Sequence, residues 1–372
     1  MPAIEEEQMA GRQIANLQGL RGVAALLVVL YHLQPVLNRA YGLTLDWHFG
    51  VVGVDIFFVL SGFVMVISNL RPDPATTRRF LVQRFVRIVP LYWLATAAII
   101  ALYLVGFRPV GLHHLDSRIV AESLAFIPSS FPHGRHDLIL TVGWTLMYEL
   151  FFYAALALTF PLRSIEKSVA VLAGVFLALC ALGRLVPDLP YLLDFFTAPI
   201  MLEFLYGAAF ALAYTRWSGE VPTWLTWAGL GLAIGGFASV VALDATAMPV
   251  PNKHDARFLL LGVPAALIVA GALAMERGGW ILKQRFLLEL GAASYVLYLF
   301  HPLALQGSVK LAGTVLSPVL AGTLALIACL AVSLLIHRLL ERPLLAWAKR
   351  RSRPRSQAIP ECSAPLAVQS AE

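Results

Sequence analysis

Long apolar stretches separated by short polar segments dominate this chain. Ten of the stretches are roughly 20 residues long, the length that an α-helix needs to cross the hydrocarbon core of a bilayer. They run over 19–38, 51–70, 88–107, 138–160, 169–186, 195–214, 223–243, 257–275, 287–307 and 314–337. The pattern predicts an all-α integral membrane protein, a bundle of about ten transmembrane helices.

Charge adds an orientation to this bundle. With the N-terminus placed inside, most of the 28 Lys and Arg residues lie in cytoplasmic segments, as the positive-inside rule requires. We therefore expect both termini to be cytoplasmic. The same asymmetry explains the net charge of +6 without a nucleic-acid partner.

Composition supports one membrane domain with polar ends, because 59% of the residues are hydrophobic and only 13% are charged. We divide the chain into a cytoplasmic segment (1–18), a transmembrane domain (19–343) and a basic cytoplasmic tail (344–372), whose Ser, Ala and Pro content favours disorder. The three cysteines have no paired spacing, so we infer neither disulfides nor a metal site from them.

The connection over 108–137 is expected to lie outside, with one helix on the membrane surface. It contains His113, His114, His133 and His136. Two pairs of histidines in a loop that contains prolines lack a defined ligand spacing, so no metal site is predicted there.

His32 is the most informative polar residue, because it lies inside the first apolar stretch. Arg21 precedes it by eleven residues, about three helical turns, so both lie on one face, roughly 16 Å apart along the axis. Ionisable groups kept in hydrocarbon usually line a polar path, a pair or an active site. Imidazole suits general-base catalysis because its ordinary pKa lies near the working pH. His32 is therefore our candidate base, and Arg21 is too distant to touch the reacting atoms.

Carboxylates occur in three further stretches. We expect Asp55 to orient or polarise His32, with a structural ion pair as the alternative. Glu149 lies near mid-membrane and must face a partner or a polar cavity; whether it orients His32 or binds substrate stays open. Glu203 is more typical of a structural contact between helices.

Arg84 and Arg87 stand at i and i+3 near the cytoplasmic mouth of the third stretch, and so share a face. Two guanidiniums there suit a phosphate, which they bind through charge-assisted hydrogen bonds. Positive-inside anchoring predicts basic residues at the same place.

Ser294, Tyr298 and His301 follow helical spacing down one face of the ninth stretch. His301 lies at a depth similar to that of His32. A lone membrane histidine is usually a packing residue, but two at matched depth favour a shared site.

Together these residues resemble the bacterial membrane acyltransferase-3 family, over Leu17 to Pro343. The similar blocks are Arg21 with His32 after ten intervening residues, Gly53–Phe63, Arg84-x-x-Arg87-Ile88-x-Pro90, Trp144-Thr145-Leu146-x-x-Glu149-x-x-Phe152-Tyr153, Ser294-Tyr295-x-x-Tyr298-Leu299-x-His301 and Glu341-Arg342-Pro343. No hydrolase-like domain follows the last stretch, so the chain resembles the stand-alone members.

The resemblance implies transfer of an acyl group, often acetyl, from cytoplasmic acyl-CoA to a sugar hydroxyl of an exopolysaccharide, O-antigen or related glycan at the bacterial inner membrane. Acyl-CoA is then a donor substrate and no cofactor is permanently bound; partners are the glycan acceptor, the bilayer and polysaccharide assembly proteins. The residues assigned to catalysis are His32, Asp55 and Glu149. Those assigned to the donor are Arg21, Arg84 and Arg87. Those assigned to the acceptor are Trp144, Tyr298 and His301.

A proton-coupled transporter or flippase of a glycan is the competing class, since intramembrane Asp, Glu and His also build proton relays. The absence of a correspondence between the first and second five stretches favours the enzyme. Direct transfer and an acyl-histidine intermediate both remain open, as do the acceptor and the acyl chain.

Overall fold

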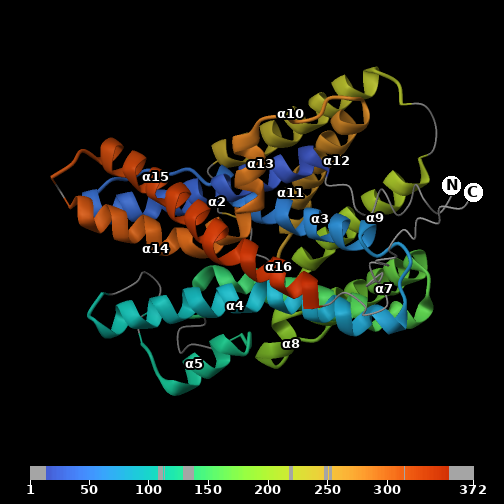
Figure 1. Cartoon of the computed structure of the whole chain (residues 1–372), viewed down its shortest axis with the longest axis horizontal. Coiled ribbons are helices and arrows are strands. Elements are labelled where there is room, and N and C mark those ends of the chain that lie inside the picture. The colour runs from blue at the N-terminus through green and yellow to red at the C-terminus, as the bar shows by residue number, and fades with distance from the viewer. Residues whose placement is uncertain are drawn as a thin grey trace, which may run out of the picture.

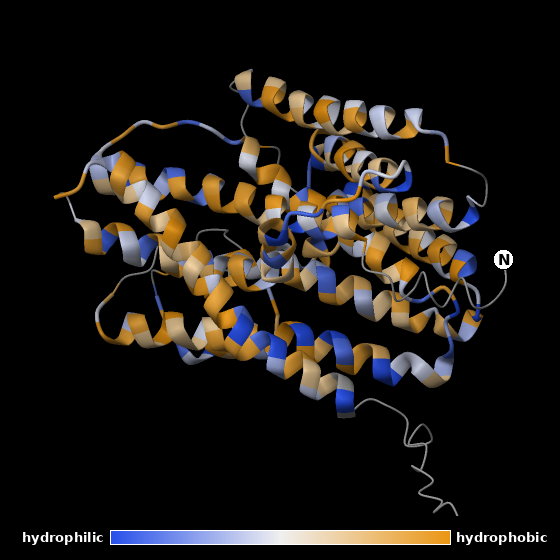
Figure 2. Ribbon diagram, turned by 45° about the horizontal axis from the view of Figure 1, so that its top comes forward, coloured by the Kyte–Doolittle hydropathy of each residue, from blue (hydrophilic) through white to orange (hydrophobic). Residues whose placement is uncertain are grey.

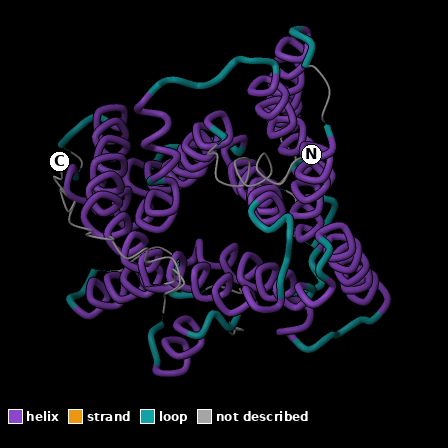
Figure 3. Tube along the Cα trace, turned by 45° about the vertical axis from the view of Figure 1, so that its right-hand side comes forward, coloured by secondary structure: helices purple, strands orange, loops and turns teal. Residues whose placement is uncertain are grey.

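The chain is helical throughout the part that its computed structural model describes, which covers residues 14–107, 112, 114–128, 138–217, 221–246, 250, 254–313 and 315–351. Within these ranges no strand is present (Figure 3). The all-α prediction is confirmed. Most of the predicted N-terminal segment and the end of the tail, 1–13 and 352–372, lie outside the described residues.

Eight helical segments are long and apolar enough to span a membrane, by length and composition. They are α2 (Ala15–Tyr41), α3 (Val52–Ile67) with the 3-10 turn before it, α4 (Thr77–Leu104), α6 (Trp144–Leu158) with its flanking turns, α7 (Ile165–Leu185), α10 (Trp224–Ala245), α11 with α12 (Arg257–Leu260, Gly262–Arg277), and α15 with α16 (Pro318–Ile336, Arg342–Arg351). A ninth is obtained if α13 (Arg285–Ala292) and α14 (Ser294–Ala312), which are bent by 76°, count as one span.

About ten spans were predicted, and eight or nine qualify among the described residues; the stretch over 195–214 is the one that does not. Its helix, α9 (Leu202–Arg216), has 15 residues, and even with the 3-10 turn before it this segment is not both long and apolar enough to count as a span. The residues before it form the end of α8 (Tyr191–Phe195) and a 3-10 turn at Pro199–Met201. Hydropathy measures the length of an apolar run, but it does not detect such a break.

The helices pack around a central pair, α2 and α3. Figure 1 shows α10 beside α12 along one edge, α14 beside α15 at the other, and α16 crossing α4, and each of these pairs is in contact. Figure 2 shows apolar residues along most of the helices, as expected for segments that meet lipid.

Glycines allow α3 and α9 to touch along their backbones. A Cβ atom on Gly62 would lie 1.9 Å from the carbonyl oxygen of Phe204, and one on Gly207 would lie 1.8 Å from that of Val59. Small residues at a membrane helix interface permit this close approach. The short α9 is thereby held against the helix that carries Asp55 and Ser61.

Stacked aromatic rings fill the space beside this contact. Phe204 stacks between Phe58 and Phe152, with ring centroids 4.7 and 4.6 Å away. All three side chains are buried. The stack joins α3, α6 and α9 and forms one wall of the region where the candidate site lies.

The last spanning segment is interrupted by a π-helical turn, His337–Glu341, between α15 and α16. His337 Nδ1 lies 2.5 Å from Glu341 Oε2, and both residues are buried. Such turns occur mostly within α-helices and often at functional sites.

The connection between α4 and α6 contains α5 (Ser117–Leu124), in the segment where a surface helix was predicted. Asp116 caps this helix by accepting a hydrogen bond from the Ile119 N–H, at 2.8 Å. Its other end is fixed to α4 by Trp93, whose Nε1–H donates to the Leu124 carbonyl. His113, His133 and His136 lie outside the described residues.

Candidate active site

Two adjoining cavities lie among α2, α3, α4, α6 and α14. We call the first the arginine cavity; its volume is about 400 Å³, including open space at its mouth, and its lining is Arg21, Leu60, Ser61, Val64, Met65, Arg84, Arg87, Glu149 and Tyr153. We call the second, of about 550 Å³, the tyrosine cavity; its lining is Arg21, Val54, Phe57, Phe58, Ser61, Arg87, Ile88, Thr145, Leu146, Glu149, Ser294, Tyr295 and Tyr298. Four residues belong to both linings, so the cavities share a wall.

The arginine cavity brings together the three residues assigned to the donor. Arg21 comes from α2, while Arg84 and Arg87 come from successive turns of α4. Arg84 is held over two aromatic rings, with its Cζ 5.6 Å from the centroid of Phe80 and 5.8 Å from that of Tyr153. These are cation–π distances.

Arg84 also keeps a free donor. Its Nε is buried and has no hydrogen-bond partner among the described residues. A buried donor without a partner costs free energy, and guanidinium groups match phosphate geometry. The arginine cavity therefore suits a phosphate-bearing ligand.

Glu149 lies at the wall shared by the two cavities. Its Oε1 accepts hydrogen bonds from Ser61 Oγ, at 3.0 Å, and from the Tyr153 hydroxyl. Its charge acts on Arg21 and Arg84. The predicted need for a partner and a polar cavity is thus met on the arginine side, and no hydrogen bond joins Glu149 to His32 in the described ranges.

His32 and His301 are in ring contact, with centroids 4.9 Å apart. Each ring directs Nδ1 at the carbonyl oxygen four residues earlier in its own helix, Val28 at 2.9 Å and Leu297 at 3.2 Å. A carbonyl only accepts, so Nδ1 carries the proton in both rings. In the neutral form this leaves each Nε2 as a proton acceptor, and that of buried His301 has no partner in the part of the chain described.

Tyr298 links the histidine pair to the tyrosine cavity. Its hydroxyl donates to the Val142 carbonyl at 3.0 Å and lies 2.8 Å from Thr145 Oγ1, while its ring centroid is 6.0 Å from that of His301. Neither histidine is in the lining of the arginine cavity or the tyrosine cavity. The polar groups therefore form a row from the arginines through Glu149 and Tyr298 to the two imidazoles.

Asp55 does not take the predicted place beside His32. Arg257 binds both of its carboxylate oxygens, Nε to Oδ1 at 2.9 Å and Nη2 to Oδ2 at 2.8 Å, and both residues are buried. A carboxylate held bidentately by a guanidinium is committed to that partner, so the orienting role is wrong and the structural ion pair is what forms. The sequence signal for Arg257 was a basic residue opening an apolar stretch, which resembles an ordinary membrane-boundary anchor.

Glu203 lies fully buried near this ion pair, where the charges of Asp55 and Arg257 act on it. Trp144, which we assigned to the acceptor, lines neither cavity. Its ring instead packs edge-on against Phe58 and Tyr148, with centroids 6.4 and 6.0 Å away. As the first residue of α6, it packs against the aromatic core.

Sequence reasoning missed the partners that hold the site. Ser61 and Tyr153 were visible within the motif blocks, but no role was assigned to them. No role was assigned to Glu341 either, although its charge acts on Arg21 from the π-helical turn. The i, i+4 spacing of His337 and Glu341 was the sequence signal for the contact between these two residues.

The sequence is similar to known proteins over most of its length. Residues 14–338 match a family model described as an acyltransferase domain (Acyl_transf_3). The chain is 35% identical to the exopolysaccharide production protein ExoZ of Rhizobium meliloti (strain 1021) over 313 residues, which cover 81% of this chain and 92% of ExoZ. It is 29% identical to the acyltransferase MdmB of Streptomyces mycarofaciens over 380 residues, 91% of this chain and 93% of MdmB.

Nodulation protein 10 of Rhizobium leguminosarum bv. viciae is 26% identical over 321 residues, 78% of this chain and 83% of that protein. No solved structure matches the chain.

Proposed function

The chain belongs to the acyltransferase-3 family, and from that premise we propose that it transfers an acetyl group from cytoplasmic acetyl-CoA to a sugar hydroxyl of an exopolysaccharide or related glycan. We place it in the inner membrane of a bacterium. Similarity to ExoZ, whose name refers to exopolysaccharide production, supports this acceptor. The observation that carries the proposal is the row of polar groups from the arginine cavity to the histidine pair.

At the donor end, we assign Arg21, Arg84 and Arg87 to the phosphates of acetyl-CoA. Charge-assisted hydrogen bonds to phosphate are short and strong, and the free Nε of Arg84 supplies one of the donors. The charge of Glu149 acts on Arg21 and Arg84, but a single carboxylate does not neutralise all three arginines. Under the expected topology this end faces the cytoplasm.

The tyrosine cavity then receives the thioester end of the donor. It joins the arginine cavity at Arg21, Ser61, Arg87 and Glu149, and its lining includes Tyr298, one helical turn from His301. A donor bound at the arginines thus extends toward the imidazoles.

The chemical step is direct attack. His32 Nε2 removes the proton of the acceptor hydroxyl as its oxygen attacks the thioester carbonyl carbon. The C–O bond forms, the C–S bond breaks, and the imidazolium returns the proton to the departing sulfur, so that CoA leaves as the thiol. His301, in ring contact with His32, positions the hydroxyl. General-base catalysis of this kind contributes about 10²- to 10⁴-fold.

His32→Ala is the test of this proposal. Purified protein in detergent is given radiolabelled acetyl-CoA and the host exopolysaccharide after mild alkaline deacetylation. We expect label on the polysaccharide with the parent protein and a loss of about 10²-fold or more with the variant, while expression and membrane insertion are unchanged.

His114→Ala is the matched control, because the side chain of His114 is 71% exposed and is in the lining of neither cavity. It should transfer label at the parent rate. Full activity of His32→Ala would remove the catalytic assignment, and absence of both transfer and CoA binding by the parent protein would favour a transporter.

A further inference from the structure

We propose that His48 and Asp244 form a subsite that binds one neutral sugar residue of the acceptor. The subsite lies between the 42–48 segment, which joins α2 to the turn before α3, and the end of α10. It deepens the proposed function and rests on it. Neither residue had been assigned a role from the sequence.

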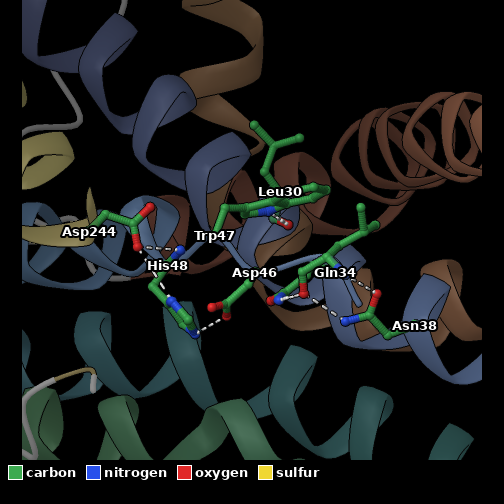
Figure 4. Close-up of polar contacts among 8 residues, drawn as sticks. Leu30, Gln34, Asn38, Asp46, Trp47, His48 and Asp244 are labelled. Atoms are coloured by element: carbon green, nitrogen blue, oxygen red, sulfur yellow. Dashed lines mark hydrogen bonds and ion pairs between the residues drawn. The ribbon is translucent and has the colours of Figure 1, made fainter. Parts of the chain in front are cut away.

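The 42–48 segment is held in a fixed shape by α2 (Figure 4). Asn38 Nδ2 and Gln34 Nε2 both donate to the Leu45 carbonyl, and the Leu45 N–H donates back to Asn38 Oδ1 at 2.9 Å. The indole Nε1–H of Trp47 donates to the Leu30 carbonyl at 3.2 Å. The segment is therefore preorganised, which lowers the entropic cost of binding a ligand.

This segment presents His48 between two carboxylates. The His48 N–H donates to Asp244 Oδ1 at 2.8 Å, and the ring places Nδ1 3.4 Å from the same oxygen and Nε2 3.5 Å from Asp46 Oδ1. The side chains of His48 and Asp244 are 34% and 16% exposed. The two contacts of the imidazole ring, at 3.4 and 3.5 Å, are longer than good hydrogen bonds. The ring nitrogens and the Asp244 carboxylate can therefore still form hydrogen bonds with an incoming hydroxyl.

A cavity of about 270 Å³, including the space at its mouth, lies under these two groups. Its other lining residues are apolar: Phe49, Val51, Val240, Leu243, Val250 and Leu261. Small-ligand sites combine an apolar wall with a few placed polar groups. A sugar ring presents the same two characters, a C–H face and a hydroxyl edge, so a ring seated at the mouth could lay its C–H face on the apolar wall and its hydroxyls on His48 and Asp244.

Tyr31 connects this cavity to the catalytic pair. Its ring centroid is 6.3 Å from that of His48 and 5.1 Å from that of His32. Together with the contacts of His301, this makes a continuous row of rings from His48 to Tyr298. A glycan whose sugar occupied the subsite would thus run over Tyr31 and bring a neighbouring hydroxyl to His32.

A purely structural latch is the alternative, in which His48 only ties the segment to α10. The chain offers a matched control, because Trp47→Phe removes a hydrogen bond of the same segment at a residue that is not in the cavity lining. A latch predicts that this variant and the cavity variants behave alike.

The test measures three quantities for Asp244→Asn, His48→Gln and Trp47→Phe: the apparent KM for deacetylated host exopolysaccharide, the apparent KM for acetyl-CoA, and hydrolysis of acetyl-CoA without acceptor. We expect the two cavity variants to raise the polysaccharide KM about tenfold and to leave the other two quantities unchanged. Trp47→Phe should match the parent protein in all three. Thermal unfolding in detergent identifies any variant that fails to fold. If Asp244→Asn fails to fold, the result for His48→Gln decides the test.

An unchanged polysaccharide KM in both cavity variants would overturn the subsite, and so would an equal rise in Trp47→Phe. If the parent protein transfers no acetyl group to polysaccharide, the proposed function fails first and the subsite falls with it.

Discussion

At the scale of residues, three guanidiniums share the arginine cavity with one carboxylate, so the charged side chains of the cavity carry an excess of positive charge. Arg84 and Arg87 contribute two of the three charges and come from one helix. A site with excess positive charge and a buried free N–H at Arg84 attracts a multiply charged anion more than a neutral ligand.

Removing this pair should therefore weaken donor binding. For Arg84→Ala with Arg87→Ala, we expect the apparent KM for acetyl-CoA to rise by at least tenfold, because hydrogen bonds to charged groups contribute about 1.5–3 kcal/mol each. The polysaccharide KM should not change. Initial rates over a range of acetyl-CoA concentrations check this.

The matched control is Arg78→Ala with Arg79→Ala, which removes the same charge from the start of α4 but lines neither cavity. Its donor KM should stay at the parent value. Equal effects of the two double variants would make Arg84 and Arg87 topology signals only.

Candidate site residues could be selected from the sequence where a polar side chain falls inside an apolar stretch, because burial in hydrocarbon is costly for such a group. That argument selected His32, Glu149 and His301, but it could not select their partners. Asp55 required a partner, and the one it has, Arg257, lies 202 residues away. Only the packing of α3 against the segment that carries Arg257 decides between that ion pair and a contact with His32.

At the scale of elements, the contact of α3 with α9 depends on glycine. In the helix interior, Gly207→Ala would place a methyl group 1.8 Å from the Val59 carbonyl oxygen, and the two helices would have to separate. Overpacking of this kind costs about 1–3 kcal/mol, and sometimes more. We expect a clearly lower unfolding temperature in detergent.

Gly235→Ala on α10 is the control, because nothing lies within 4 Å of a Cβ atom there. Alanine in an exposed helix position is favoured over glycine by about 0.5–1 kcal/mol, so stability should be equal or higher. A Gly207→Ala protein as stable as the parent would contradict the close contact.

Elements were predictable as far as their apolar length identifies them. Nine of the ten predicted stretches correspond to spanning segments when the bent α13–α14 pair is counted. The tenth, at α9, forms a helix of 15 residues behind the turn at Pro199–Met201 and is not among the spanning segments. The 76° bend between α13 and α14 likewise has no hydropathy signal, because both halves are apolar.

At the scale of the whole molecule, the row of polar groups has a direction only if the two ends of the bundle face opposite sides of a membrane. The 42–48 segment precedes α3 and the turn at Pro74–Thr76 follows it. The charge distribution predicts that the first of these is outside and the second is cytoplasmic.

Cysteine labelling tests this orientation. In a background without the three native cysteines, D46C should react with a membrane-impermeant maleimide in cells whose outer membrane is opened. A75C should react only after the inner membrane is disrupted. Both parent positions are exposed. The reverse pattern would invert the bundle, and labelling of both from outside would exclude α3 as a complete span.

The arginine cavity and the pair His32 and His301 lie at different places along one row of polar groups, and this separation bears on which part of the donor has to cross the membrane. Under the proposed function, the nucleotide stays anchored at one level while its thioester reaches the imidazoles at another. Carrying the whole donor through hydrocarbon would strip water from several phosphate charges, at a cost of several kcal/mol each. Under the same proposal, only the small, uncharged acetyl group makes the passage, and an external polymer is acetylated without export of CoA.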